Sequence, residues 1–176
     1  MLTCSFLGHS KLYDPNIKIY GNLNLTIRKL IMNHDEIEFL IYQMGTYHMG
    51  EFYNLCLAAI MEAKQRYPVK KFIFTKIKDP KIGNDLCEKG KVIPDYFYDK
   101  TIAPFDNYTT IHLKQILRWI ISKSHLLLCY IYKDFYDYNS EYEYAQKNNL
   151  TIFNMIDTCL LYTSPINHNV SPGCTV

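Results

Sequence analysis

Apolar positions along the chain gather in short runs that alternate with stretches of helical spacing. The runs at 2–7, 38–44, 71–77, 126–131 and 150–155 are rich in Leu, Ile and Phe, and their length predicts buried β-strands. Between them, apolar residues recur every three or four positions, which predicts helices from 23 onward, at 52–67 and at 112–124. A further helix is expected at 140–148, because Ser140 and Glu143 match the S-x-x-E capping box.

This alternation of strands and helices predicts the fold class. Strands separated by helices are joined by right-handed crossovers, which gives a mainly parallel sheet covered on both faces. We therefore expect an α/β, Rossmann-like fold. The segment 79–110 interrupts the pattern with three prolines and no clean period, and a long irregular insertion of this kind is usually functional or mobile.

The last part of the chain differs from the rest. Residues 158–176 contain no Lys, Arg, Asp or Glu and show no strand or helical period. We predict a single domain over 1–157 and a disordered tail. Residues 159–164 also resemble the translation of a transposon adapter end at the edge of a metagenomic contig, so the tail is suspected not to be native.

Composition narrows the classes of partner. The chain has 176 residues, of which 48% are hydrophobic and 20% charged, so a globular domain is expected. The net charge of +2 is small and indicates neither nucleic acid nor a membrane as a partner. No signal peptide and no run of membrane-spanning length is apparent, which favours the cytoplasm. The six cysteines form no C-x-x-C pair, so no metal or cofactor is predicted; Cys4, Cys56 and Cys129 are expected to be core residues with reduced thiols.

Three loops that follow strands carry the candidate chemistry: 8–10, 45–52 and 133–141. In open parallel sheets, ligands bind outside the carboxyl ends of the strands, and helix N-termini there attract anions. His9 and His48 are candidates for donating to a phosphate or stacking on a base, Glu51 for accepting from ribose hydroxyls, and Arg118 for reaching an anion. The predicted ligand-binding residues are Gly8, His9, Ser10, Gly45, Thr46, Tyr47, His48, Gly50, Glu51, Phe52, Arg118, Ser140 and Glu141.

Structural explanations compete with each of these roles. Glycines between strand and helix often serve the turn alone, and Glu51 at a helix start satisfies the helix dipole without any ligand. Arg118 can cover apolar surface with its stem, and His48 can be an ordinary loop residue. The 16 tyrosines suit a nucleotide pocket, yet an AT-rich genome also produces them. No dinucleotide fingerprint, P-loop, G-x-S-x-G or H-E-x-x-H pattern occurs, so no catalytic residue is predicted.

Several segments resemble one protein family. Residues 4–9, Cys-Ser-Phe-Leu-Gly-His, are similar to the C-x-F-x-G-H-R opening of YpsA-like proteins in the SLOG superfamily. The stretch 45–59 resembles that family's glycine-rich loop and helix, 117–124 its R-N-x-x-M-(I/V)-x-x-S-D segment, and 143–147 its last helix. The resemblance extends over about 2–156 and implies a Rossmann-like fold shared with the LOG nucleotide phosphoribohydrolases and the DprA proteins.

Departures from the family pattern shape the functional expectation. Ser10 stands where the family has arginine, Tyr53 where it has aspartate, and 137–140 where LOG enzymes have a phosphate-binding G-G-T loop. The resemblance therefore implies a binder rather than a hydrolase: a protein that holds a cyclic ADP-ribose-type or cyclic nucleotide immune signal, and that acts as a phage anti-defence sponge. The alternatives are a LOG-like nucleotide N-glycosidic hydrolase that uses Glu51, and a YpsA-like protein with no small ligand.

The resemblance also implies a homo-oligomer, either a dimer or a tetramer. The apolar helix around Trp119 and Ile120 is the expected isologous face, and residues 94–108 are expected to cover a neighbour's site.

Overall fold

The computed structural model describes residues 1–42, 50–67, 72–77, 97–104, 113–132 and 138–156. Strands and helices alternate through most of these residues, as the hydrophobic pattern predicts; the exception is 72–102, where the structure describes two strands and no helix between them. In chain order they are β1 Leu2–Gly8, α1 Asn16–Asn33, β2 Ile37–Tyr42, α2 Glu51–Arg66, β3 Phe72–Ile77, β4 Lys100–Ile102, α4 Leu113–Ser122, β5 Leu126–Tyr130, α5 Asn139–Lys147 and β6 Thr151–Asn154.

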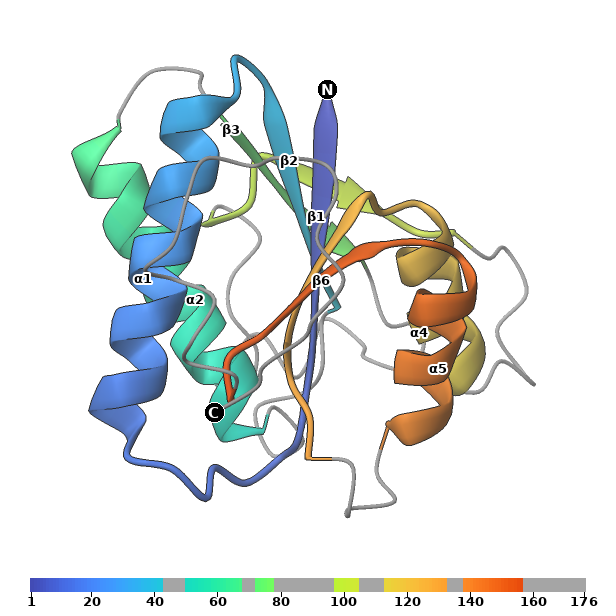
Figure 1. The fold of residues 1–176 in the computed structure, drawn as a ribbon. Helices are drawn as coiled ribbons and strands as arrows, with labels where there is room; N and C mark the ends of the chain where they lie inside the picture. The colour runs from blue at the N-terminus through green and yellow to red at the C-terminus, as the bar shows by residue number, and fades with distance from the viewer. Residues whose placement is uncertain (43–49, 68–71, 78–96, 105–112, 133–137, 157–176) are drawn as a thin grey trace, which may run out of the picture.

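The strands form one parallel sheet in the order β4-β3-β2-β1-β5-β6 (Figure 1). Helices α1 and α2 lie together on one face, and α4 and α5 on the other. The chain therefore winds from β1 outward to β4, then crosses back to the far side of β1 for β5 and β6. This arrangement confirms the predicted α/β, Rossmann-like class.

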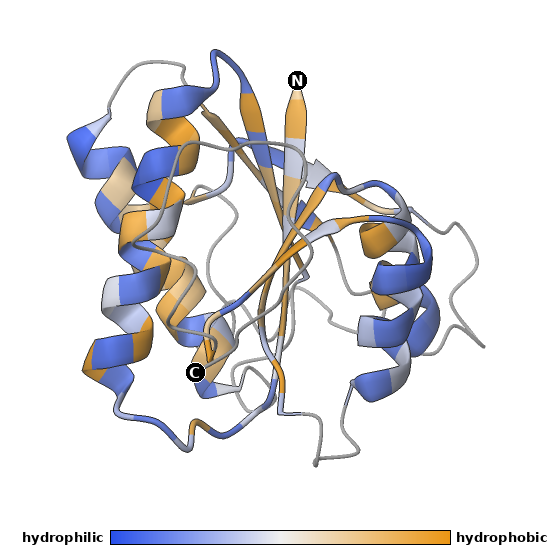
Figure 2. Cartoon of the chain, in the orientation of Figure 1, coloured by the Kyte–Doolittle hydropathy of each residue, from blue (hydrophilic) through white to orange (hydrophobic). Residues whose placement is uncertain are grey.

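Each face of the sheet packs against its own pair of helices. Phe6 and Phe39 belong to the core beneath α1 and α2, whereas Leu7 and Leu127 belong to the core beneath α4 and α5. The central strands are accordingly apolar along most of their length (Figure 2). Cys4, Cys56 and Cys129 are fully buried with free thiols, as predicted, and burial raises the pKa of the Cys4 and Cys56 thiols.

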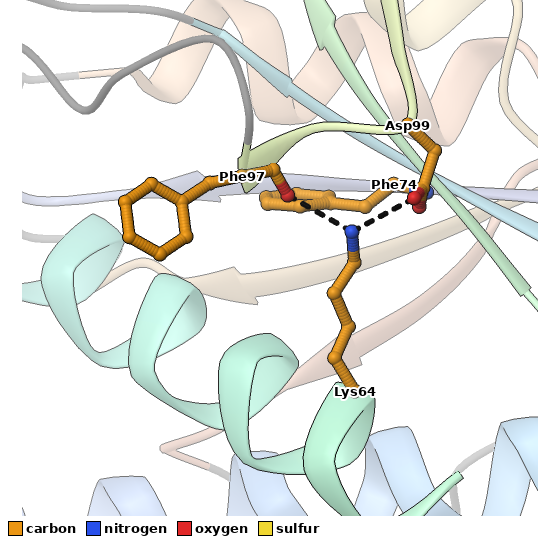
Figure 3. A network of polar contacts seen from close by, with 4 residues as sticks. All are labelled: Lys64, Phe74, Phe97 and Asp99. Carbon is orange, nitrogen blue, oxygen red and sulfur yellow. Dashed lines mark hydrogen bonds and ion pairs between the residues drawn. The ribbon is translucent and has the colours of Figure 1, made fainter. Parts of the chain in front are cut away.

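Strand β4 lies within the segment 79–110 that was predicted to be irregular, of which 79–96 and 105–110 are outside the described residues. Only one of its three residues has an apolar side chain, so no hydrophobic period in the sequence predicts this strand. Asp99 fixes its start: the Asp99 N–H donates to the Phe74 carbonyl at 2.9 Å, and Oδ2 accepts from the Phe74 N–H at 2.8 Å. Lys64 of α2 donates to both Asp99 Oδ1 and the Phe97 carbonyl at 2.9 Å, which ties α2 to this edge of the sheet (Figure 3).

Two helix starts differ from the prediction. Helix α1 begins at Asn16 rather than near 23. The pattern missed its first turn because Ile17, an apolar residue in that turn, is exposed and lies outside the buried stripe. Helix α5 begins at Asn139 after Tyr138, whose φ of 65° is left-handed. The predicted capping box is wrong, because Ser140 lies inside the helix and no side chain caps it. Within the described residues, no helix has both the length and the apolarity that crossing a membrane requires.

Candidate functional site

The sheet reverses its winding between β1 and β5. The chain leaves β1 toward α1 on one face and leaves β5 toward α5 on the opposite face, so the two connections diverge at the carboxyl ends of adjacent strands. In open α/β sheets this switch point is where ligands bind. This edge is bordered by 8–14, which begin at the last residue of β1, and by 130–132 and 138, which begin at the last residue of β5.

Gly8 and Phe52 serve packing at this edge. A Cβ at Gly8 would lie 2.2 Å from Phe52 Cδ1, so the glycine leaves room for the phenyl ring. Phe52 is fully buried and stacks on Tyr130 with ring centroids 5.9 Å apart. The prediction that Phe52 contacts a ligand is therefore wrong: the first turn of α2 directs this side chain into the core.

The start of α2 holds the loop after β1. The Glu51 N–H donates to the Ser10 carbonyl at 2.8 Å, and Glu51 Oε2 accepts from the Leu12 N–H at 2.7 Å. A Cβ at Gly50 would lie 2.2 Å from the Ser10 Cα, so this close approach requires glycine. The structure thus brings Ser10, Gly50 and Glu51 together as predicted, while Gly45, Thr46, Tyr47 and His48 lie outside the described residues.

His9 supports the edge from within. The residue is 3% exposed, its backbone N–H donates to the Tyr130 carbonyl at 3.1 Å, and its ring Nε2 accepts from the Tyr132 N–H at 2.9 Å. An imidazole nitrogen that accepts a hydrogen bond carries no proton. Nε2 therefore cannot donate to a phosphate, contrary to the role predicted for His9. The ring instead stacks beside Tyr132, with centroids 6.5 Å apart and an interplanar angle of 19°.

A tyrosine and aspartate network at the switch point was not predicted. The Tyr130 hydroxyl accepts from the N–H groups of Tyr13 at 2.8 Å and Asp14 at 3.1 Å, and it donates to Asp14 Oδ2 at 3.1 Å. The Tyr132 hydroxyl donates to the same Oδ2, and this hydrogen bond to Asp14 raises the pKa of Tyr132. The network joins the loop before α1 to the end of β5.

This network has a weak signature in the sequence. Tyr130 and Tyr132 alternate at the end of an apolar strand, which places them on the same side of β5 and its extension. Tyr13 and Asp14 follow the first strand, which such a fold places next to it. Hydropathy alone groups Tyr130 with the apolar residues of its strand and does not show what its hydroxyl contacts.

Arg118 and Glu141 lie together, but between α4 and α5. Glu141 is 6% exposed, and its Oε1 lies 3.9 Å from both Lys114 Nζ and Arg118 Nε. The Ser140 hydroxyl donates to the same oxygen at 2.9 Å, and the Arg118 guanidinium lies over the Tyr144 ring. The predicted ligand roles of Glu141 and Arg118 are thus replaced by a contact between helices. A buried carboxylate in the first turn of α5 also makes this helix start unfavourable for a phosphate.

The predicted isologous face is contradicted at one of its two named residues, Ile120. Ile120 is 2% exposed and belongs to the core with Leu40 and Tyr42, so it cannot meet a second copy. Trp119 is partly buried against the same core. Residues 94–96 and 105–108 of the segment expected to cover a neighbouring site lie outside the described residues.

Within the described part of the chain, no group of three or more His, Cys, Asp or Glu side chains is close enough to hold a metal ion. The sequence matches no protein-family model, and the search of curated proteins finds no match either.

Proposed function

We propose that this protein binds a nucleotide-derived ligand at the carboxyl edge of β1 and β5 without cleaving it. The observation that carries the proposal is the switch point itself, where the two strand ends supply a hydrogen-bonded loop and a group of aromatic side chains. Tyrosine rings with hydroxyl groups suit a ligand that has both flat and polar parts.

The arrangement favours binding over hydrolysis. Glu51 is the carboxylate that a LOG-like mechanism would use, and its Oε2 already accepts a hydrogen bond from the Leu12 N–H. This bond ties the side chain to the loop after β1, and so restricts the positions from which Oε1 could act as a general base on a water or a substrate hydroxyl. Glu141, the other carboxylate among the predicted residues, is buried beside two cations.

The ligand class that we propose is a cyclic ADP-ribose-type or cyclic nucleotide signal, held in a sponge that removes it from solution. The similarity of residues 4–9 and 45–59 to SLOG proteins supports this assignment, together with the differences at Ser10 and Tyr53. Sequestration needs affinity and a slow dissociation rate, and both benefit from a rim whose backbone is held in place before binding.

The proposal is tested by isothermal titration calorimetry of the whole chain. The ligands are cyclic ADP-ribose isomers, cyclic dinucleotides and adenosine 5′-monophosphate. Chromatography of each ligand after incubation shows whether it is returned intact. We expect saturable binding of at least one ligand and quantitative recovery. Absence of binding at high micromolar ligand, with circular dichroism showing folded protein, would overturn it.

A hydrolase gives a different result in the same experiment. Free base would appear with the wild-type chain and disappear with Glu51→Gln, which keeps the size of the side chain but removes its charge. Asp35→Asn is a matched control, because Asp35 is an exposed carboxylate in the turn after α1. Release of base that depends on Glu51 would replace the binding proposal with the hydrolase.

A further inference from the structure

Tyr13 and Asp14 occupy an unusual position at the edge of the sheet. They lie in the loop between β1 and α1, and Tyr13 is 57% exposed although its backbone is held tightly. The N–H groups of both residues donate to one oxygen, the hydroxyl of Tyr130. A buried phenol from β5 therefore sets the direction of two consecutive residues that the sequence places 116 and 117 positions away.

The ring of Tyr13 is oriented by its neighbours as well. It meets Tyr132 edge to face, with centroids 5.9 Å apart and an interplanar angle of 86°. Tyr132 meets Tyr130 in the same way, at 5.5 Å and 89°. A side chain that is ordered before binding loses less conformational entropy when a ligand stacks on it.

Asp14 has one carboxylate oxygen committed to the protein. Oδ2 accepts from the hydroxyls of Tyr130 and Tyr132, and no described residue donates to Oδ1. An ionised carboxylate accepts several hydrogen bonds, so Oδ1 retains capacity for ligand donors. Vicinal hydroxyls of a ribose are donors of this kind.

We infer that Tyr13 and Asp14 recognise the nucleoside part of the ligand, with the Tyr13 ring stacking on the base and Asp14 Oδ1 accepting from the ribose hydroxyls. The inference rests on the proposed function and assigns its specificity to two residues absent from the predicted site. The start of α5 carries the buried Glu141 carboxylate rather than a phosphate-binding loop. Contacts to the base and the ribose explain how a nucleotide is held without such a loop.

The first test separates base stacking from the rest of the site. Wild type, Tyr13→Phe and Tyr13→Ala are titrated by calorimetry with adenosine 5′-monophosphate and with ribose 5-phosphate. Loss of a stacked base contact lowers affinity about 5- to 100-fold, so we expect that loss for the nucleotide with Tyr13→Ala only. Tyr13→Phe keeps the ring and is expected to stay near wild type, and any affinity for ribose 5-phosphate is expected to be the same in all three proteins.

The second test addresses the ribose hydroxyls. Asp14→Asn replaces one carboxylate oxygen by a donor, while the remaining oxygen still accepts from the two phenols. We expect it to weaken binding of adenosine 5′-monophosphate about 10-fold and to leave unchanged the affinity for the 2′,3′-dideoxy analogue. The dideoxy analogue therefore reports whether the edge of the sheet is still intact in the variant.

The outcomes separate the two proposals. If no nucleotide of the panel binds to wild type, the proposed function fails and this inference with it. If another nucleotide binds but adenosine 5′-monophosphate does not, or if Tyr13→Ala binds it as tightly as wild type, the inference fails while the proposed function stands. Equal weakening of the normal and dideoxy ligands by Asp14→Asn would likewise reject the ribose contact.

Discussion

Gly50 offers the sharpest test of how the edge of the sheet is built. A Cβ at this position would lie 2.2 Å from the Cα, 2.9 Å from the carbonyl oxygen and 3.0 Å from the carbonyl carbon of Ser10. These are backbone atoms, so no side-chain rotation relieves the contact, and the loop after β1 must move away from α2. Such overpacking costs about 1–3 kcal/mol.

The movement has a second cost. The Ser10 carbonyl accepts the Glu51 N–H at 2.8 Å, and a displaced loop loses this bond, which contributes about 1 kcal/mol. We expect Gly50→Ala to lower the free energy of unfolding by about 2–4 kcal/mol in total. For a chain of this length, that corresponds to a fall in Tm of about 5–15 °C.

Gly21 provides the matched control. It lies within α1 and is exposed, and a Cβ added there would have no heavy atom within 4 Å beyond its own helix backbone and chain neighbours. Alanine is favoured over glycine in a helix interior, so Gly21→Ala should stabilise the chain by about 0.5–1 kcal/mol. The same chemical change thus has opposite signs at the two positions.

The free energy of unfolding of both variants is measured by urea unfolding. The transition is followed by far-ultraviolet circular dichroism and by the fluorescence of the single tryptophan, Trp119. If Gly50→Ala stays within about 0.5 kcal/mol of wild type, or if Gly21→Ala is destabilised to the same extent as Gly50→Ala, the proposed packing of α2 on the loop is refuted.

Two further predictions concern other contacts. Asp99→Ala removes the acceptor for the Phe74 N–H and the partner of Lys64, so it should lower the free energy of unfolding by about 1–2 kcal/mol. Asp99→Asn keeps an acceptor for the Phe74 N–H and should lower it by less than half of that amount. Equal losses for the two variants in chemical denaturation would argue against the backbone contact. The pKa of Tyr132 is raised in the folded chain because its hydroxyl donates to Asp14, so the unfolded chain releases this proton first and stability should fall as pH rises above about 10. Thermal melts between about pH 9 and 11 measure this fall, which should be smaller in Tyr132→Phe; an identical pH dependence in the two proteins would contradict the assignment.

The sheet was predictable where burial alone decides the structure. The strands β1, β2, β3, β5 and β6 lie in segments in which most residues are apolar, and the predicted ranges overlap each of them. The three-residue strand β4 was missed because a hydrogen-bonding aspartate, not an apolar run, holds its start against β3. The start of α1 was missed because Ile17 is 83% exposed and so falls outside the buried stripe.

The candidate site was only partly predictable, for a different physical reason. Glycines that permit close approach are visible in a sequence, and Gly8 and Gly50 lie where the loops meet. Contacts between polar groups far apart in the chain are not visible in it. The position of Asp14 Oδ2 between two phenols depends on β1 and β5 being neighbours, which no local pattern specifies.

The pairing of β1 with β5 also has a consequence for synthesis on the ribosome. When β1 emerges it finds its first partner, β2, about 35 residues later, but its other edge stays open until β5 has been translated. An open central strand is a template for pairing with other nascent chains, so delayed translation between β2 and β5 should favour aggregation. The Tyr130 hydroxyl arrives with this last central strand, and only then can the loop before α1 adopt its final conformation. The ligand binding that we propose should consequently appear in a single late step of folding rather than grow with chain length.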